Sequence, residues 1–298
     1  MGKSHASIHE LRTLEEKINS GTITNGLAQH YMRLVRELKV RRSELVVKCG
    51  TVLLQSKRLS AEELWLTHEQ LCIAALEVQD KETALMCIKK LCAKFPDSIR
   101  VGRLRGMALE MQGKWKEAAT VYDHLLDRSP TNAPILKRKV AMERSQGNLK
   151  AAVELLNQYL ATYMADTEAW AELADIYIES EMYVQAAFCM EELIATAPHN
   201  YVNHLRYAEV LYTQGGPENL RTARKYFAAA VELTNANCLR ALYGLWACAS
   251  AVATIKGQHR QPEDESDLLE LSGKNLMELY KQRCPEKLVV VQKMVTGA

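Results

Sequence analysis

Three short motifs in this chain could in principle belong to a catalytic or phosphate-binding site. Gly2-Lys3-Ser4 ends like a phosphate-binding Walker A loop, but nothing upstream of it supplies the rest of that motif. His68-Glu69 begins like the helical zinc motif of metalloproteases, but the second histidine is missing. Gly215-Gly216 follows no predicted strand, so it does not form a dinucleotide-binding loop. We therefore predict no enzyme activity and no cofactor.

The eight cysteines and eight histidines are scattered along the chain. No Cys-x-x-Cys pair occurs, and no histidine and cysteine lie at the spacing of a zinc site. Most cysteines fall on the apolar faces of predicted helices. We interpret them as buried thiols of a protein in a reducing compartment, and we expect neither disulfides nor a metal.

Composition and charge set limits on the kind of partner. The chain has 298 residues, of which 48% are hydrophobic, so it can bury a core. A net charge of +2 gives no general reason to expect nucleic acid or an anionic membrane as a partner. The longest uncharged run, residues 241–255, is shorter than the roughly 20 residues that span a bilayer, and residues 1–10 lead into no apolar signal segment. We expect a soluble chain that reaches a membrane only through partners.

Small residues and prolines recur along the chain at one fixed interval of about 34 residues. The recurring positions are Ala84, Ala118, Ala152 and Ala186, together with Pro96, Pro130 and Pro198. In residues 167–200, Trp170 and Tyr177 precede the alanine as well. This pattern resembles the tetratricopeptide repeat, a helix–turn–helix unit.

Each recurring residue has a steric reason. The alanine lies where the two helices of a repeat touch, and the proline ends the second helix because it lacks an N–H. Gly113, Gly147 and Gly215 lie near the ends of first helices, where a left-handed cap favours glycine. We predict an all-α, right-handed solenoid of about five repeats with flanking N- and C-terminal helices. Trp170 and Tyr177 are expected to anchor it, with Trp170→Ala costing about 3–5 kcal/mol if the ring is buried.

The sequence divides into three parts: an N-terminal helical extension (1–60), the repeat solenoid (61–256), and a C-terminal capping helix with a tail (257–298). In the extension we expect a helix over 9–20 and helical periodicity over 27–54 that carries a basic run. That run is either a solvated helix face or a contact for an acidic partner or lipid headgroups. We expect a lengthened turn of about three extra residues in the fifth repeat, a polar break over 257–265, a capping helix over 266–283 and a short apolar tail over 288–291.

A repeat solenoid presents a concave surface lined mainly by its first helices. The positions expected to face this groove are Arg100, Arg103, Lys137 and Arg144 in the second and third repeats, and Asp175, Glu209 and Tyr212 in the fourth and fifth. They predict a peptide or helix partner with a matching charge gradient, or else they are ordinary exposed charges. No asparagine stands at the ninth position of a first helix, so we do not expect a carboxylate-clamp co-chaperone.

Residues 184–200, 207–233 and 240–250 carry more than the general repeat pattern. They resemble the subunit 2 family of the endoplasmic reticulum membrane protein complex, and the resemblance extends over about residues 61–256. Its most specific feature is the insertion Tyr-Thr-Gln-Gly-Gly-Pro-Glu-Asn-Leu at 212–220, which ordinary repeats of this class lack.

The resemblance implies a non-catalytic scaffold, peripheral to the membrane, on the cytoplasmic face of the endoplasmic reticulum. Its implied partners are cytosolic segments of membrane-embedded subunits and a globular cytosolic subunit, with no nucleic acid and no small-molecule substrate. The complex of this family inserts transmembrane segments of tail-anchored and multipass proteins. The alternative is a free cytosolic repeat adaptor that binds a peptide motif.

Overall fold

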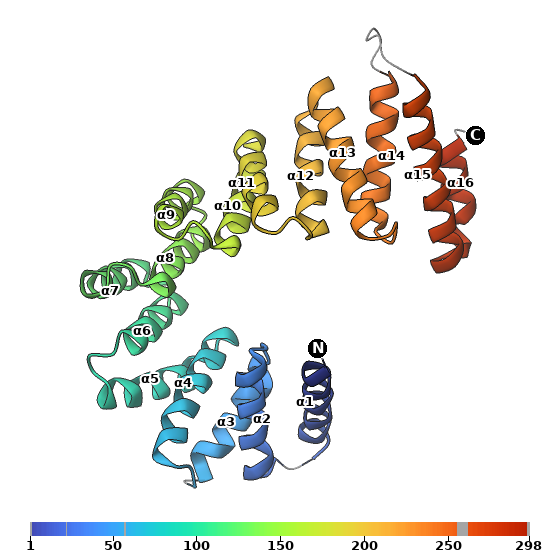
Figure 1. Ribbon diagram of the computed structural model, residues 1–298. Coiled ribbons are helices and arrows are strands. Elements are labelled where there is room, and N and C mark those ends of the chain that lie inside the picture. Colours follow the sequence, from blue (N-terminus) through green and yellow to red (C-terminus); the bar gives the residue numbers. More distant parts are fainter. Residues whose placement is uncertain (1, 22, 57, 255–261, 297–298) are drawn as a thin grey trace. The chain divides into compact units, whose positions relative to one another are not determined.

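The computed structural model describes residues 2–21, 23–56, 58–254 and 262–296, and within them every regular element is a helix (Figure 1). The prediction of an all-α fold is confirmed. The elements are α1 (Gly2–Ser20), α2 (Asn25–Leu38), α3 (Ser43–Ser56), α4 (Ala61–Glu77), α5 (Lys81–Lys94), α6 (Ile99–Met111), α7 (Trp115–Arg128), α8 (Ala133–Ser145), α9 (Leu149–Thr162), α10 (Thr167–Glu179), α11 (Tyr183–Thr196), α12 (Tyr201–Gln214), α13 (Pro217–Leu233), α14 (Leu239–Thr254), α15 (Pro262–Arg283), the 3-10 helix η1 (Pro285–Lys287) and α16 (Leu288–Thr296).

The five predicted repeats correspond to the helix pairs from α4–α5 to α12–α13. Contacts divide the chain into two compact units, residues 1–146 and 147–298, with the boundary in the turn after α8. The division into an extension, a solenoid and a capping region was based on sequence patterns, whereas these two units are defined by contacts. It therefore stays a prediction.

Polar side chains start most of the repeat helices. Asp80, Asn132, Asp166 and Asn200 each accept a hydrogen bond from a backbone N–H in the first turn of the helix that follows. Such caps satisfy donors that have no partner inside the helix. The boundaries of these helices are therefore encoded locally.

The repeats pack through small residues. The four periodic alanines have no exposed area. At Gly106, an added Cβ would lie 2.3 Å from the ring of Tyr122, and at Gly244 it would lie 2.2 Å from the ring of Phe227. Both aromatic side chains are fully buried. Each ring thus occupies the space that a larger residue on the facing helix would need.

The fifth repeat corrects one expectation. The turn between α12 and α13 is not lengthened, because only Gly215 and Gly216 separate the two helices. Both glycines have positive φ (71° and 85°), and Pro217 begins α13. The second helix takes up the insertion instead: α13 has 17 residues, whereas α11 has 14. A glycine pair followed by proline at the first helical position reverses the chain tightly, so the extra residues join the helix.

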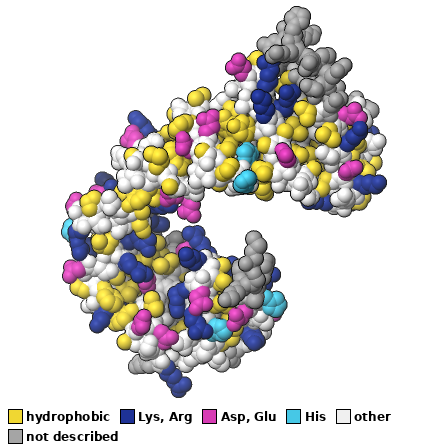
Figure 2. All heavy atoms as spheres, in the orientation of Figure 1, with side chains coloured by type: hydrophobic (Ala, Val, Ile, Leu, Met, Phe, Trp, Pro, Cys, Tyr) yellow, Lys and Arg dark blue, Asp and Glu magenta, His cyan; other side chains and the backbone are white. Residues whose placement is uncertain are grey.

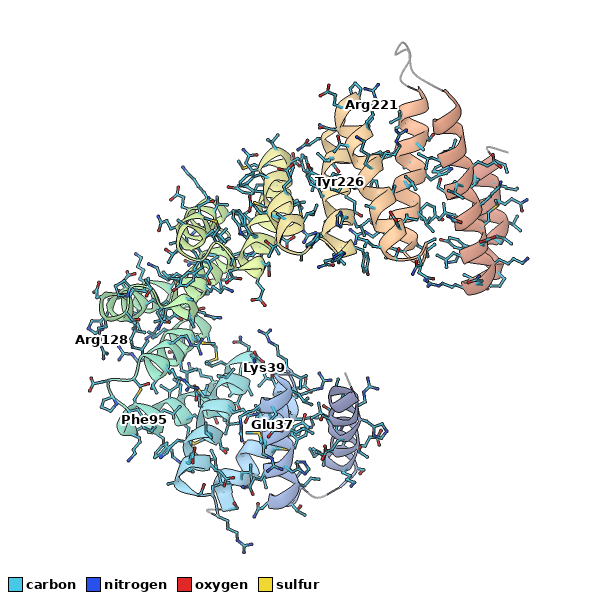
Figure 3. All side chains as sticks on the ribbon, in the orientation of Figure 1. Glu37, Lys39, Phe95, Arg128, Arg221 and Tyr226 are labelled. Atoms are coloured by element: carbon cyan, nitrogen blue, oxygen red, sulfur yellow. The ribbon has the colours of Figure 1, made fainter. Side chains whose placement is uncertain are left out.

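The flanking segments also differ from expectation. The first helix starts at residue 2, not 9, and the helical periodicity over 27–54 belongs to two helices, α2 and α3. Lys39 ends α2 with a left-handed backbone (φ 53°), and it lies at the turn labelled in Figure 3. At the other end, α15 begins at Pro262, so the expected polar break continues as helix from there, while its residues 257–261 lie outside the described part of the chain.

The apolar tail is a helix, α16, that packs on α15. Val291 is buried with Leu242, Leu276 and Leu279 in one cluster. These contacts join α14, α15 and α16, so the tail covers apolar surface at the end of the second unit, as the terminal unit of a repeat array must.

Candidate partner-binding surfaces

Three of the predicted groove residues are already ion-paired within the chain. The guanidinium of Arg100 binds both carboxylate oxygens of Glu69, at 3.0 and 2.8 Å. Arg240 holds Glu209 in the same way, with two contacts of 2.7 Å, and Arg206 pairs with Asp175. Each pair links the first helix of one repeat to the first helix of the next. Much of the predicted charge is therefore used to join repeats.

The other predicted groove residues fall in separate units. Arg103 on α6 and Lys137 on α8 are half-buried, and Arg144 near the end of α8 is exposed, all in the first unit. Tyr212 on α12 is 40% exposed and belongs to the second unit. On the same helix, Leu205 is 3% exposed and belongs to the core.

The basic run of the N-terminal extension is partly neutralised as well. Arg42 donates to Glu15 at 2.8 Å, Arg41 lies 3.6 Å from Glu77, and the Arg36 guanidinium donates to Gln70 at 2.6 Å. These contacts tie α2 and the turn after it to α1 and α4. Figure 2 shows basic side chains gathered over this first unit.

A buried polar network inside the first unit was not anticipated. Glu110 on α6 is 7% exposed. It accepts two hydrogen bonds from the Arg138 guanidinium and one from the Tyr122 hydroxyl. Burial and the adjacent carboxylate raise the pKa of Tyr122 well above its usual range. The sequence feature that could have indicated this network is the single glutamate within the otherwise apolar run Met107–Met111.

Trp170 is not part of the fully buried core, and its role as an anchor of the array stays a prediction. Its ring is half-buried and packs edge-on against Phe188, with the ring centroids 6.0 Å apart. Its indole N–H donates to the backbone carbonyl of Met164 at 2.8 Å. Phe188 and Met164 are themselves 55% and 68% exposed. The tryptophan therefore helps to build an apolar patch that the repeat pattern did not predict.

A second apolar feature is a pocket of about 320 Å³ in the first unit, between α4, α5 and the start of α6. Phe95, at the end of α5 (Figure 3), stands edge-on to Trp65 with 5.5 Å between ring centroids. The pocket is bordered by the ion pair of Glu69 and Arg100. It can accept an apolar side chain beside a charged group.

The cysteines show no sign of activation. Burial raises the pKa of Cys49 and Cys87 to about 11, and that of Cys72, Cys189 and Cys248 to about 12. Because the thiolate is the reactive form, these thiols are chemically inert in the folded chain.

We expect alkylation at pH 8 to separate the two classes of cysteine. Iodoacetamide should label the half-buried Cys92 and Cys238 first, and Cys284 more slowly, because its hydrogen bond to Glu286 raises its pKa. The five buried cysteines should react only after urea is added. Peptide mass spectrometry over time measures this order, and rapid labelling of Cys72 in the native chain would contradict it.

Among the residues that the structure describes, no cluster of three or more His, Cys, Asp or Glu side chains is placed to hold a metal ion. None of the described helices combines the length and the apolar character needed to cross a membrane.

Comparison with known proteins identifies close relatives. The family model described as the EMC2 TPR-like repeat domain matches residues 83–219. ER membrane protein complex subunit 2-A of Xenopus laevis is 42% identical over 224 residues, which cover 75% of each chain. ER membrane protein complex subunit 2 of Dictyostelium discoideum is 34% identical over 288 residues, covering 92% of this chain and 89% of that protein.

One solved structure supports the fold. The C-terminal part of a TPR repeat-containing protein from Cytophaga hutchinsonii superposes with a TM-score of 0.59 at 15% identity, over 90% of this chain and 99% of that one. At this identity the similarity shows the tetratricopeptide solenoid and nothing about its partners.

Proposed function

Because this chain belongs to the ER membrane protein complex subunit 2 family, we propose that it is a non-catalytic scaffold subunit of that complex. The complex, in this proposal, inserts transmembrane segments of tail-anchored and multipass proteins. The observation that carries the proposal is the 34% identity to the Dictyostelium subunit over 92% of this chain. Identity over nearly the whole length supports a shared place in the complex, beyond a shared fold.

We place the chain on the cytoplasmic face of the endoplasmic reticulum membrane, attached through other subunits. Its partners would be cytosolic segments of membrane-embedded subunits and a globular cytosolic subunit. Stacked helix pairs with exposed first helices give the long surfaces that such bracing requires. The fold supports this role, as does the absence of a membrane-crossing helix in the described part.

Within the predicted groove, Arg103 and Lys137 are the residues that we propose for partner binding in the first unit. They lie on consecutive first helices, α6 and α8, and both are half-buried. In the second unit we propose Tyr212, which lies on the first helix α12 and is 40% exposed.

The test is purification of the tagged chain from membranes solubilised in mild detergent, followed by native mass measurement. We expect a complex with multipass membrane subunits. Arg103→Glu with Lys137→Glu should release at least one subunit while helicity by circular dichroism is unchanged. The matched control reverses the exposed charges of Arg105 and Lys116 in the same unit and should keep the complex intact.

Fractionation distinguishes the alternative. A free cytosolic adaptor would stay in the supernatant, whereas the proposed subunit sediments with membranes. Recovery of soluble chaperones alone would overturn the proposal. A complex that remains intact in the charge-reversal variant would remove Arg103 and Lys137 as contacts and leave membership of the complex standing.

A further inference from the structure

Four apolar side chains form one surface feature in the second unit, which we call the α11 patch: Met164, Trp170, Val184 and Phe188. Val184 is 73% exposed, Met164 68% and Phe188 55%. Burying large apolar side chains is favourable, so a group of them left in water on one face is typical of an interaction site.

A ring contact, a shared helix face and one hydrogen bond relate the members of the α11 patch to one another. Val184 and Phe188 are one helical turn apart on α11, so they share a face. The Phe188 ring meets Trp170 of α10 edge-on, and the Trp170 indole fixes the backbone at Met164. The patch thus joins α10, α11 and the turn before α10.

That turn is held in place from its other side too. The rings of Tyr159 and Tyr163 stack with their centroids 4.8 Å apart. The Tyr159 hydroxyl donates to Asp166 at 2.7 Å, and Asp166 in turn caps α10. The turn that presents Met164 is therefore built rigidly. A surface fixed before binding loses little conformational entropy when a partner arrives.

The stretch of chain that carries the patch is rich in acidic residues. Residues 149–200 contain nine acidic residues and a single basic one, Lys150. Glu181 lies in the turn just before α11, and Glu191 and Glu192 follow Phe188 by one turn on the helix, so acidic residues precede and follow the apolar pair. The acidic residues are Glu154, Asp166, Glu168, Glu172, Asp175, Glu179, Glu181, Glu191 and Glu192.

Apolar anchors and an acidic border together define the occupant. Acidic side chains repel nucleic acid and anionic lipid, whereas they attract lysine and arginine. Two anchors one helical turn apart match the spacing of an amphipathic helix laid against the surface. We propose that the α11 patch docks an amphipathic helix of a partner protein that carries apolar residues at i and i+4 flanked by lysine or arginine. This inference does not depend on the proposed function.

The test uses the full chain and two fluorescein-labelled helical peptides. Both carry leucine at i and i+4; one has lysine and the other glutamate at every flanking position. Fluorescence anisotropy should show binding of the lysine peptide and none of the glutamate peptide. Binding should weaken severalfold between 50 mM and 300 mM salt, because exposed charges are screened.

Variants then assign the binding to the patch. Val184→Ser with Phe188→Ser should weaken the lysine peptide at least about tenfold, the effect expected of central apolar anchors. The matched control, Val289→Ser with Val290→Ser, alters two exposed valines on α16 in the same unit and should not change affinity. Glu181→Lys with Glu192→Lys should weaken binding without touching the anchors.

Three outcomes would overturn the proposal. The first is equal affinity of the patch variant and the wild-type chain for the lysine peptide. The second is equal binding of both peptides. The third is a concentration-dependent dimer in sedimentation velocity that the patch variant abolishes, because the occupant would then be a second copy of this chain. Circular dichroism of each variant verifies that it remains folded.

Discussion

Phe227→Ala lowers the free energy of local unfolding in the second unit by about 3–5 kcal/mol, the range for losing a buried phenylalanine. Phe227 is 2% exposed and lies against Gly244, where there is no side chain to move into the space that the ring leaves. The cavity would open between α13 and α14. Hydrogen exchange on peptides from these helices measures the change locally, because a repeat array need not unfold in one step.

The chain supplies its own control for this experiment. Phe188→Ala removes the same side chain from the same unit, but from a position that is 55% exposed. We expect it to cost less than about 1 kcal/mol. A similar loss from both substitutions would mean that Gly244 and Phe227 are not closely packed. Gly244→Ala should destabilise as well, since its Cβ would meet the ring at 2.2 Å.

Glu110→Ala lowers the free energy of unfolding of the first unit by about 3 kcal/mol, because the buried Tyr122 and the half-buried Arg138 both lose their acceptor. The Arg138 guanidinium loses its carboxylate, and the Tyr122 hydroxyl loses its acceptor. Removing one member of a buried charged network leaves the others desolvated and unpaired. Urea unfolding followed by circular dichroism, together with hydrogen exchange on α6 and α8, measures the effect.

The control for this prediction is Glu69→Ala, which removes an equally well-formed carboxylate–arginine pair from the surface. The side chains of Arg100 and Glu69 in that pair are 73% and 19% exposed, whereas those of Arg138 and Glu110 are 34% and 6% exposed. The exposed pair should be worth less than about 1 kcal/mol. If Glu110→Ala and Glu69→Ala lowered the free energy of unfolding equally, the stabilisation by the Glu110 network would not depend on its burial.

The helical fold was predictable because its signals are local and repeated. Side-chain caps and left-handed glycines mark the helix ends, and each can be recognised within a few residues. The fifth repeat shows where this reasoning stops. Comparing the spacing of the fifth repeat with the regular interval of the other repeats locates the insertion. Only packing determines that the three extra residues lengthen α13 and leave the turn short.

The site was less predictable, because exposure and pairing depend on neighbours that are distant in sequence. Arg100, Asp175 and Glu209 were assigned to a groove from their positions in the repeat, yet each is paired with a charge on an adjacent repeat. Trp170 has the signature of a core residue, but it is only half-buried and its ring meets the exposed Phe188. The position of a residue in the repeat predicts the direction in which its side chain leaves its own helix. It does not predict which side chain of a neighbouring helix will contact it.

By itself the sequence determined that this chain is a helical repeat protein of a recognisable family, because a fixed spacing of small residues, glycines and prolines leaves few other ways to pack. Tertiary structure alone decided which charges hold the repeats together, that Glu110 is buried, and that the exposed Phe188 ring meets the half-buried ring of Trp170. The physical reason is that burial and ion pairing are properties of the packed helices together, and no single helix encodes them.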